Sequence, residues 1–477
     1  MLLGRARVNR SAVTAVDVVR PSGEYRSLLR RPIRSVSGEH LADLSLAPGL
    51  LVRQVLAEQV AAPGQRTDDR LAAIATAGEL FATATLAGES PEDYCHAQAR
   101  CSGAPSTVAR RGLALIASCT AGLREDLARQ RPAGVTTDWR QALRTGRPLW
   151  SRRGRTLAVS AAGNHPGAHA VWLPALGLGY RVALRPSHRD PFTARRLVHA
   201  LRAAGLAPAY CSLLPTEHDA LDTLVAAADL AVLFGGPDLQ ARYGDRARVR
   251  VEGPGRAKIL VGRDTDPRTA LDVVAASVAD QGGVLCTSAT AVFAEHDPAG
   301  LAAALADRLS RLPALPPEHP RAALPVLPAE RARAITATAL RQAGGAPELA
   351  SRGALVAELG DGSAALRPAV FLLDRVDHPA AGVELPFPCV WVLPWSPRDG
   401  VRPLRGSLAL TVLGADDHFF GRCAAEPTIR LLHRGPTPTW DWPAGSPHDG
   451  YPGEFLMRAK TLTDHQLHHS EDELTDE

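Results

Sequence analysis

The sequence predicts an α/β protein with two parallel sheets, and two observations support this. Between residues 156 and 236, short apolar runs typical of buried strands alternate with amphipathic runs typical of helices, and the connections are short. A second alternating series runs from residue 258 to residue 412. Because 477 residues are too many for one ordinary core, we expect two or three domains.

The region before residue 156 has a different pattern. Residues 1 to about 60 are predicted to form short strands and turns. Helical spacing of apolar residues predicts amphipathic helices over Thr67 to Leu86 and over Val108 to Leu127. The polar stretch from Gln130 to Arg155, interrupted by proline and glycine, is predicted to be a linker or an exposed hairpin.

The first alternating series predicts where a cofactor would bind. We expect strands at 156–160, 181–185, 210–214 and 230–234, and helices at 170–178, 190–204 and 218–227. Asp190 followed by Pro191 is typical of a helix start. Because ligands bind at the carboxyl ends of parallel strands, the turns after Ser160, Leu184 and Phe234 are the candidate cofactor turns.

The second series and the tail complete the chain. We expect strands at 258–261, 289–293, 368–373, 389–393 and 407–412, and helices at 267–279, 298–311 and 328–343. The tail, 461–477, is polar and acidic, and we expect it to be disordered. Its three histidines are not expected to hold a metal, because nothing around them would shape a site.

Composition excludes several functional classes. The 54 basic and 50 acidic residues are too balanced to indicate nucleic-acid binding. No apolar run reaches the length of a membrane span, and the first residues lack the apolar core of a signal peptide. The seven scattered cysteines show no Cys-x-x-Cys spacing. This usage predicts reduced thiols in a cytoplasmic protein without a zinc site.

The candidate chemistry centres on one cysteine. Cys286 follows the glycine pair Gly282 and Gly283, and a strand-like run follows it. A cysteine in a tight turn beside backbone N–H groups can ionise and hold a covalent intermediate. The structural alternative is a small buried cysteine after a helix end.

Three polar residues in glycine- or proline-bounded turns complete a candidate site. They are Asn164, Glu252 and Glu384. Together with Cys286 they form an acyl-transfer constellation: the thiol attacks a carbonyl, the amide and a backbone N–H stabilise the oxyanion, and a carboxylate moves a proton. Taken singly, each has a structural alternative as a turn former or a loop acid.

The order and spacing of these pieces resemble the aldehyde dehydrogenase superfamily. The likeness covers residues from about 65 to 460. It rests on five pieces in the family's order: Asn164-His165-Pro166-Gly167, Arg185-Pro186-Ser187, Phe234-Gly235-Gly236, Glu252-Gly253-Pro254-Gly255-Arg256 and Gly283-Val284-Leu285-Cys286. Cys286 follows Glu252 by 34 positions, which agrees with the family's separation, and Glu384 with Phe387 resembles its later glutamate and phenylalanine pair.

The resemblance implies roles for these residues. Cys286 would be the nucleophile that forms a thiohemiacetal and then a thioester. Asn164 and the Cys286 amide would form the oxyanion hole, and Glu252 would activate either the thiol or the hydrolytic water. The cofactor would be NADP or NAD, bound by Arg185, Ser187, His188, Phe234, Gly236, Glu384 and Phe387, with Glu384 at the nicotinamide ribose.

The resemblance also implies a domain organisation. Residues 1–127 and 156–252 would form a Rossmann-like dinucleotide-binding domain, and residues 253–427 a second α/β catalytic domain. Residues 128–155 and 428–445 would form an oligomerisation hairpin that joins a homodimer or homotetramer.

Departures from the family pattern leave the reaction open. Arg185 replaces the usual lysine, and His188 stands where many NAD-specific members carry a glutamate that repels a 2′-phosphate. Pro237 follows the cofactor glycine in place of serine, and Pro254 and Arg256 alter the glutamate box.

Three functions therefore compete. The first is oxidation of an aldehyde to a carboxylic acid, for which Glu252 is present. The second is reduction of an acyl-CoA or acyl-carrier-protein thioester, because Gly253-Pro254-Gly255-Arg256 is similar to the acyl-thioester reductases of the superfamily. The third is a catalytically silent scaffold, against which the retained asparagine, cysteine and glutamates argue.

Overall fold

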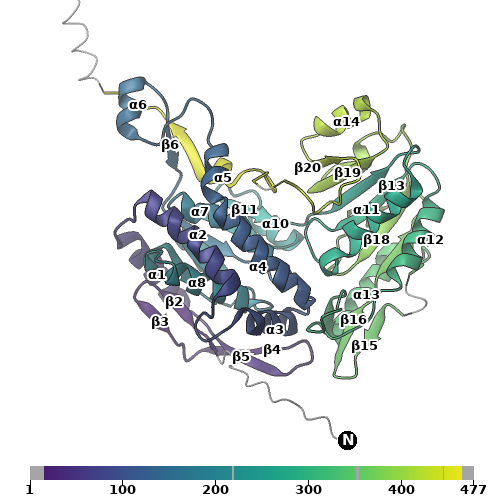
Figure 1. Cartoon of the computed structure of the whole chain (residues 1–477), viewed down its shortest axis with the longest axis horizontal. Coiled ribbons are helices and arrows are strands. Elements are labelled where there is room, and N and C mark those ends of the chain that lie inside the picture. Colours follow the sequence, from purple (N-terminus) through teal and green to yellow (C-terminus); the bar gives the residue numbers. More distant parts are fainter. Residues whose placement is uncertain (1–14, 218–219, 351–353, 444, 465–477) are drawn as a thin grey trace, which may run out of the picture.

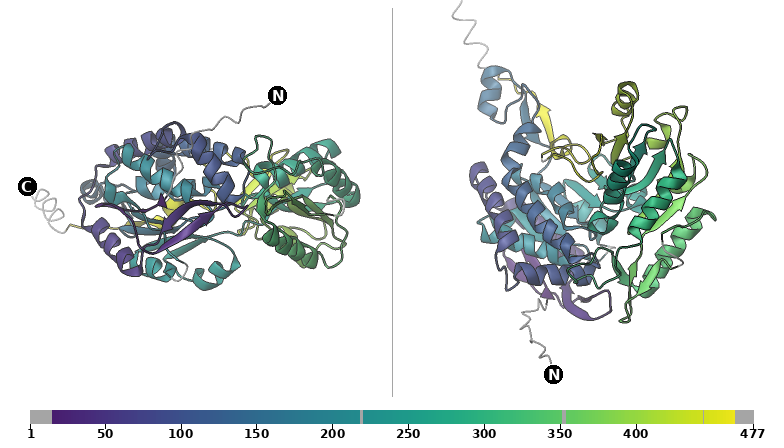
Figure 2. Two further views of the ribbon diagram at one scale, coloured as in Figure 1. Left: turned by 90° about the horizontal axis from the view of Figure 1, so that it is seen from below. Right: turned by 45° about the vertical axis from the view of Figure 1, so that its right-hand side comes forward.

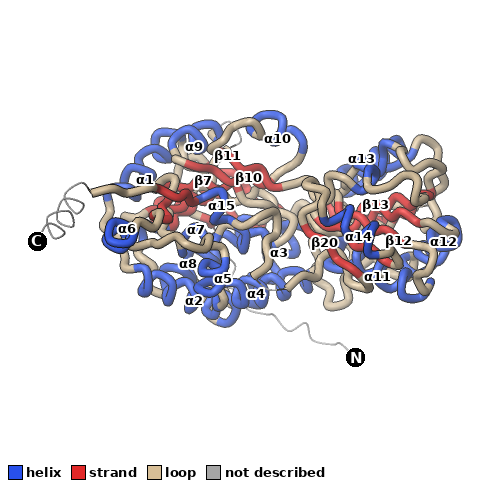
Figure 3. Tube along the Cα trace, turned by 90° about the horizontal axis from the view of Figure 1, so that it is seen from above, coloured by secondary structure: helices blue, strands red, loops and turns tan. Residues whose placement is uncertain are grey.

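A computed structural model describes residues 15–217, 220–350, 354–443 and 445–464. Two lobes, each a sheet covered by helices, lie side by side (Figures 1 and 3). A two-stranded ribbon with a short helix projects beyond the first lobe. The predicted fold class, two α/β units with a hairpin, is confirmed.

The sheet of the first lobe is parallel through five strands and ends in an antiparallel hairpin. Its order is β11-β10-β7-β8-β9-β2-β3. The strands are Val249–Glu252 (β11), Leu230–Phe234 (β10), Thr156–Ser160 (β7), Arg181–Arg185 (β8), Cys211–Leu213 (β9), Val18–Arg20 (β2) and Gly23–Tyr25 (β3). β7, β8, β9, β10 and β11 run parallel, whereas β2 is antiparallel to β9.

Alternate side chains of these strands pack against two helical layers. Leu157 and Val159 of β7 belong to one core cluster, and Ala158 belongs to another. The first cluster contains residues of Thr67–Thr83 (α2), Pro91–Ser102 (α3), Ser106–Ala121 (α4), Leu123–Arg129 (α5), Leu173–Gly177 (α7) and Pro191–Ala203 (α8). The second contains residues of Gly49–Ala61 (α1), Leu221–Ala227 (α9) and Pro237–Tyr243 (α10). A period of two thus gives both faces of the sheet a core.

The second lobe contains a parallel sheet of order β17-β18-β13-β12-β19-β20. The strands are Ala369–Leu372 (β17), Cys389–Pro394 (β18), Ala289–Ala294 (β13), Ala257–Val261 (β12), Ala409–Leu413 (β19) and Leu431–Arg434 (β20). Helices Pro267–Ala279 (α11) and Pro298–Leu309 (α12) share one core cluster, and Ala329–Ala343 (α13) and Asp417–Ala424 (α14) share the other.

Smaller elements surround the two sheets. One three-stranded sheet comprises Ala15–Val16 (β1), Arg30–Arg34 (β4) and His40–Ser45 (β5), and another Val326–Pro328 (β14), Val356–Glu358 (β15) and Ser363–Leu366 (β16). Short 3-10 turns occupy Pro166–Val171 (η1), Pro208–Tyr210 (η2), Asp280–Gly283 (η3), Pro379–Gly382 (η4) and Arg402–Leu404 (η5).

One domain boundary predicted from the sequence is wrong. Residues 149–152 form a strand (Leu149–Arg152, β6) after a helix (Trp139–Thr145, α6), but the partner of β6 is Met457–Lys460 (β21). β21 follows a short helix, Pro452–Leu456 (α15). Within 428–445 the structure instead places β20, which pairs with β19 in the second sheet. In the second strand of the hairpin only Met457 joins a core, and the residues from Arg458 to Lys460 are exposed, so the strand lacks the apolar pattern that identifies buried strands.

Two further predictions concern the membrane and the tail. Within the described residues, no helix combines the length and the apolarity that a membrane crossing requires. Most of the predicted disordered tail, 465–477, with His465, His468 and His469, lies outside the described residues.

Candidate active site

The predicted site residues gather in a cleft between the two sheets. Its volume is about 2060 Å³. The last residues of four parallel strands of the first lobe line it: Ser160, Arg185, Phe234 and Glu252. The other wall carries Cys286, just before β13, and Glu384, just before β18. The carboxyl ends of one sheet therefore face the amino ends of the other. The site is built from both lobes, which lie side by side (Figure 2).

The loop that presents Cys286 depends on left-handed backbone. Gln281, Gly282 and Gly283 have φ of 56°, 77° and 60°. Glycine adopts such angles freely, whereas residues with a Cβ rarely do. The backbone therefore suits Gly282 and Gly283 but not Gln281. The hydroxyl of Ser288 accepts a hydrogen bond from the Leu285 N–H at 3.2 Å and closes the turn. The helix thus ends abruptly, and the thiol reaches the cleft.

The glutamate box packs directly against this loop. A Cβ built at Gly255 would lie 1.6 Å from the Cys286 carbonyl oxygen, so only glycine fits there. Oε2 of Glu384 accepts hydrogen bonds from the N–H groups of Gly255 (2.7 Å) and Arg256 (2.9 Å). Glu384 therefore fixes the box; its predicted contact with a nicotinamide ribose stays a prediction.

We expect Gly255→Ala to remove most turnover, because the added methyl displaces the backbone that holds the nucleophile. Overpacking of this kind costs about 1–3 kcal/mol, so the melting temperature should fall as well. Gly421→Ala is the matched control, because a Cβ there meets no atom within 4 Å. Steady-state rates and thermal melts of both variants test this; normal activity of Gly255→Ala would contradict it.

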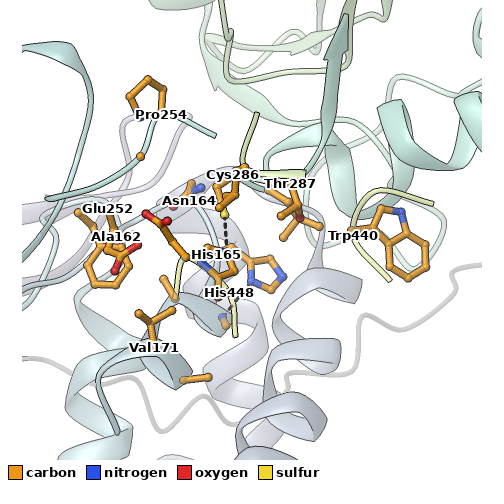
Figure 4. A pocket seen from close by; sticks show the side chains of 18 of the residues that line it. Ala162, Asn164, His165, Val171, Glu252, Pro254, Cys286, Thr287, Trp440 and His448 are labelled. Carbon is orange, nitrogen blue, oxygen red and sulfur yellow. Dashed lines mark hydrogen bonds between the residues drawn. The ribbon is translucent and has the colours of Figure 1, made fainter. Parts of the chain in front are cut away.

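Cys286 is half-buried in the wall of the cleft, and its thiol lies in an acidic environment (Figure 4). Burial raises its pKa to about 12, and the carboxylates of Glu384 and Glu252 add to the rise. The backbone N–H groups of Cys286 and Thr287 oppose it. The sulfur is therefore a neutral thiol at pH 7 unless a base removes its proton.

Asn164 reaches the same loop from the first lobe. Its Nδ2 donates a hydrogen bond of 2.7 Å to the carbonyl of Val284, two residues before the cysteine. A side-chain amide carries two N–H donors, so this contact uses one of them. The neighbouring His165 binds the Gln281 side chain at 2.9 Å and ties the same turn to the first lobe.

Glu252 is buried and ion-paired. Its Oε1 lies 2.6 Å from Nε of Arg250, two residues earlier on the same face of β11. Burial raises the pKa of this carboxyl, and the charge of Arg250 opposes the rise. The carboxylate is thus held at the edge of the cleft beside a fixed cation.

One residue of the site had no signal in the sequence. Nε2 of His448 lies 3.3 Å from Sγ of Cys286, and the two are 162 positions apart. His448 lies in the connection between β20 and α15, which has no regular structure and no motif. Burial lowers its pKa to about 4; Asp449 opposes and Arg250 adds to that shift.

Three of the predicted cofactor residues, Arg185, Ser187 and His188, lie at the end of β8 and just after it, and they line the same cleft. Nε of Arg185 donates to the Thr216 hydroxyl at 3.0 Å and Nη1 to the Ser160 hydroxyl at 3.2 Å. Nε2 of His188 lies 3.1 Å from the Thr216 carbonyl. Arg185 therefore braces two strand ends, a contact that the sequence did not indicate.

Comparison with known proteins identifies the family. The model of the aldehyde dehydrogenase family matches residues 156–399, which is about half of the chain. The chain belongs to this family. The aldehyde dehydrogenase superfamily predicted from the sequence is therefore confirmed.

Similar proteins extend this result. The phenylacetaldehyde dehydrogenase of Pseudomonas fluorescens is 31% identical over 140 residues, which cover 27% of this chain and 28% of that protein. A crystal structure of an indole-3-acetaldehyde dehydrogenase with NAD+ is 16% identical, with a TM-score of 0.79 over 95% of this chain and 97% of that one. The aldehyde dehydrogenase KauB of Pseudomonas aeruginosa is also 16% identical, with a TM-score of 0.79 over 94% and 96%. The structural matches show the aldehyde dehydrogenase fold over nearly the whole chain.

The cleft of this aldehyde dehydrogenase family member fits a dinucleotide. A Cβ at Gly236, after β10, would meet no atom within 4 Å, so ligand atoms can approach the backbone there. The cleft is continuous from Arg185 and Ser187 to Cys286, so one extended ligand can span it. Donors at one end and the thiol at the other match a polar cofactor whose reactive end meets the nucleophile.

Proposed function

We propose that the protein oxidises an aldehyde to a carboxylic acid with NAD or NADP, through a thioester on Cys286. The observation that supports it most is the Cys286 thiol, facing a cleft between two parallel sheets and joined to Asn164 through its own loop. Family membership supports the same reaction class.

The reaction has two halves, formation of the thioester and its hydrolysis, and different residues act in each. Sγ of Cys286 attacks the carbonyl carbon, and the carbonyl electron pair moves to oxygen, where the Asn164 amide and the Cys286 N–H stabilise it. A bound nicotinamide supplies the hydride acceptor. The carbon is then held on Cys286 as a thioester. Glu252 takes a proton from the water that attacks this thioester, and the carbon–sulfur bond breaks.

The cleft supports an apolar, aromatic-sized substrate. Beyond the thiol it is lined by Leu115, Val171, Trp440 and Trp442. Aromatic walls bind apolar groups through large buried area. The phenylacetaldehyde dehydrogenase named above acts, by its name, on such an aldehyde.

Incubation with phenylacetaldehyde and either nicotinamide cofactor tests this function. We expect the cofactor to be reduced in equimolar amount with the acid formed. If the protein oxidises no aldehyde in a panel of aryl and alkyl aldehydes, that result contradicts the proposal.

A second candidate function is reduction of an acyl thioester to the aldehyde. The ion pair between Arg250 and Glu252 favours it, because the guanidinium opposes the rise in the carboxyl pKa that burial causes and so limits the strength of Glu252 as a base toward water. Attack of Cys286 on an acyl-CoA would release the free coenzyme thiol and leave the same enzyme thioester. Incubation with an acyl-CoA and NADPH, against aldehyde and NADP, separates the two directions.

We predict that NADP is accepted at least as well as NAD. Position 188 is a histidine, and Arg185, Ser187 and His188 line the cofactor end of the cleft. A carboxylate would repel a 2′-phosphate, whereas guanidinium, hydroxyl and imidazole groups can donate to it. The measurement is kcat/KM for both cofactors in the wild type and in His188→Glu, which should lose activity with NADP.

The alternative in this region is Glu217. It pairs with Arg31 at 3.0 Å, and its charge raises the pKa of Arg185, although burial lowers that pKa overall. A strong preference of the wild type for NAD would contradict the prediction. If Glu217→Gln then preferred NADP, Glu217 would be the carboxylate that causes the preference for NAD.

We further propose that the ribbon of β6 and β21 joins subunits into a homodimer or homotetramer. The ribbon projects from the first lobe, and Trp139 of the adjoining α6 is 52% exposed. Aromatic side chains are enriched at protein interfaces relative to the rest of the surface. All seven cysteines are free thiols, which supports a cytoplasmic location.

A further inference from the structure

The imidazole of His448 contacts the Cys286 thiol, and an imidazole can act as a base. Its Nε2 lies 3.3 Å from Sγ of Cys286 (Figure 4). Its Nδ1 is buried and, among the described residues, has no hydrogen-bond partner. Among the described residues, neither ring nitrogen bonds to a backbone group of this loop.

The loop that presents this imidazole is fixed from several sides. Nη2 of Arg250 donates a hydrogen bond to the carbonyl of Asp449. The carboxylate of Asp449 lies 3.0 Å from Nε of Arg430. The ring of Trp442 packs edge-on against His448, with 5.7 Å between centroids. These contacts hold the imidazole in one place against the sulfur, so it is a positioned group.

The geometry of the pair favours proton transfer, because Nε2 lies 3.3 Å from Sγ. The surrounding charges act in both directions. Glu252 and Glu384 raise the pKa of the thiol, while Asp449 raises and Arg250 lowers the pKa of the imidazole. Since burial lowers the pKa of His448 to about 4, its ring is neutral at pH 7 and one nitrogen has a free electron pair. Glu252 is the competing base, but it is already paired with Arg250.

We propose that His448 is the general base that takes the proton of the Cys286 thiol, leaving Glu252 for the hydrolytic water. As the S–H bond breaks and the S–C bond forms, the proton moves to Nε2 and the carbonyl electron pair moves to oxygen. Because the pKa of His448 is lowered to about 4, the imidazolium then releases this proton to solvent and is neutral again in the thioester. When water or another nucleophile breaks the C–S bond, Sγ keeps the electron pair of that bond and takes up a proton from solvent.

This inference rests on the proposed function only for the identity of the electrophile, so a general alkylating reagent can test it. Iodoacetamide forms the same S–C bond while its C–I bond breaks, and the thiol loses the same proton. The rate of Cys286 alkylation is followed by peptide mass spectrometry between about pH 6 and pH 9, without cofactor or substrate. The wild type is compared with His448→Gln, His448→Asn and Glu252→Gln.

We expect His448→Gln to slow alkylation about 100-fold at pH 7, the usual size of general-base catalysis. Its rate should then rise about tenfold per pH unit, because only the thiolate fraction reacts. The wild-type rate should vary little over this range. Glu252→Gln removes a carboxylate that raises the thiol pKa, so it should not slow alkylation.

His199→Gln is the matched control. His199 is an imidazole on α8 near Glu24 (3.9 Å), and burial also lowers its pKa to about 4. We expect Cys286 in this variant to be alkylated at the wild-type rate.

Three outcomes would overturn the inference: an unchanged rate in both His448 variants, an equal fall in Glu252→Gln, or a uniform fall at every pH, which indicates a packing role. Aldehyde oxidation is measured in the same preparations. A wild type that oxidises no aldehyde yet shows the His448-dependent profile would refute the proposed function and keep the inference.

Discussion

Cys286→Ala is expected to abolish turnover while the fold and dinucleotide binding remain. The thiol forms the covalent bond in both candidate functions, and alanine has no group that can replace it. The loop should survive, since its turn is set by the glycine pair and by Ser288. Turnover, thermal melting and cofactor titration by fluorescence provide the three measurements.

Cys286→Ser is the control for shape in this experiment. Serine keeps the size and a hydroxyl but is a much weaker nucleophile, so it should be nearly as inactive as alanine. More than a few per cent of wild-type activity in the alanine variant would make the cysteine structural.

Glu252→Gln is expected to slow hydrolysis of the thioester far more than its formation. The amide cannot accept a proton from water, and it keeps the shape of the carboxylate beside Arg250. In rapid-mixing experiments with aldehyde, we expect a burst of reduced cofactor followed by a steady state about 100-fold slower than that of the wild type.

If the burst is lost together with the steady-state rate, Glu252 acts before hydride transfer. Arg250→Met is the companion variant, because it removes the ion pair and keeps Glu252. It also removes the hydrogen bond to the Asp449 carbonyl beside His448, so the burst, which reports thioester formation, is measured separately from hydrolysis. If the ion pair restrains the base, hydrolysis should become faster relative to the burst. No change would show that the pair is not limiting.

Much of the fold could be predicted because buried parallel strands are continuous apolar runs. The strand 230–234 and the helix 267–279 have the predicted bounds. The helix start at Asp190 is confirmed by its side chain, which accepts from the Thr193 N–H at 3.1 Å. These elements follow from local residue pattern alone.

The elements that the prediction omitted have identifiable causes. On the buried face of α1 lies Gln59, which binds the Val182 carbonyl and the Ser212 hydroxyl, both at 3.0 Å, and so interrupts the apolar pattern. For α3 a signal was present: Ser90 and Asp93 form a capping box around Pro91.

The site was predictable only where motifs mark it. Asn164, Glu252, Cys286 and Glu384 line one cleft, as their turns indicated. His448 comes from a loop without a motif, and its position depends on Arg250 and Asp449 meeting in three dimensions. Contacts between distant loops depend on the assembled lobes and leave no local pattern.

Because the cleft lies between the two sheets, the concentration of its ligand affects the stability of the whole molecule. Each wall of the cleft belongs to a different lobe, so a cofactor seated there binds the native arrangement and has no counterpart in the unfolded chain. At a free concentration of 100 times Kd, such a ligand stabilises the native state by about 2.7 kcal/mol. The amount of folded enzyme would then rise and fall with the nicotinamide pool, and starvation for cofactor would expose the chain to proteolysis.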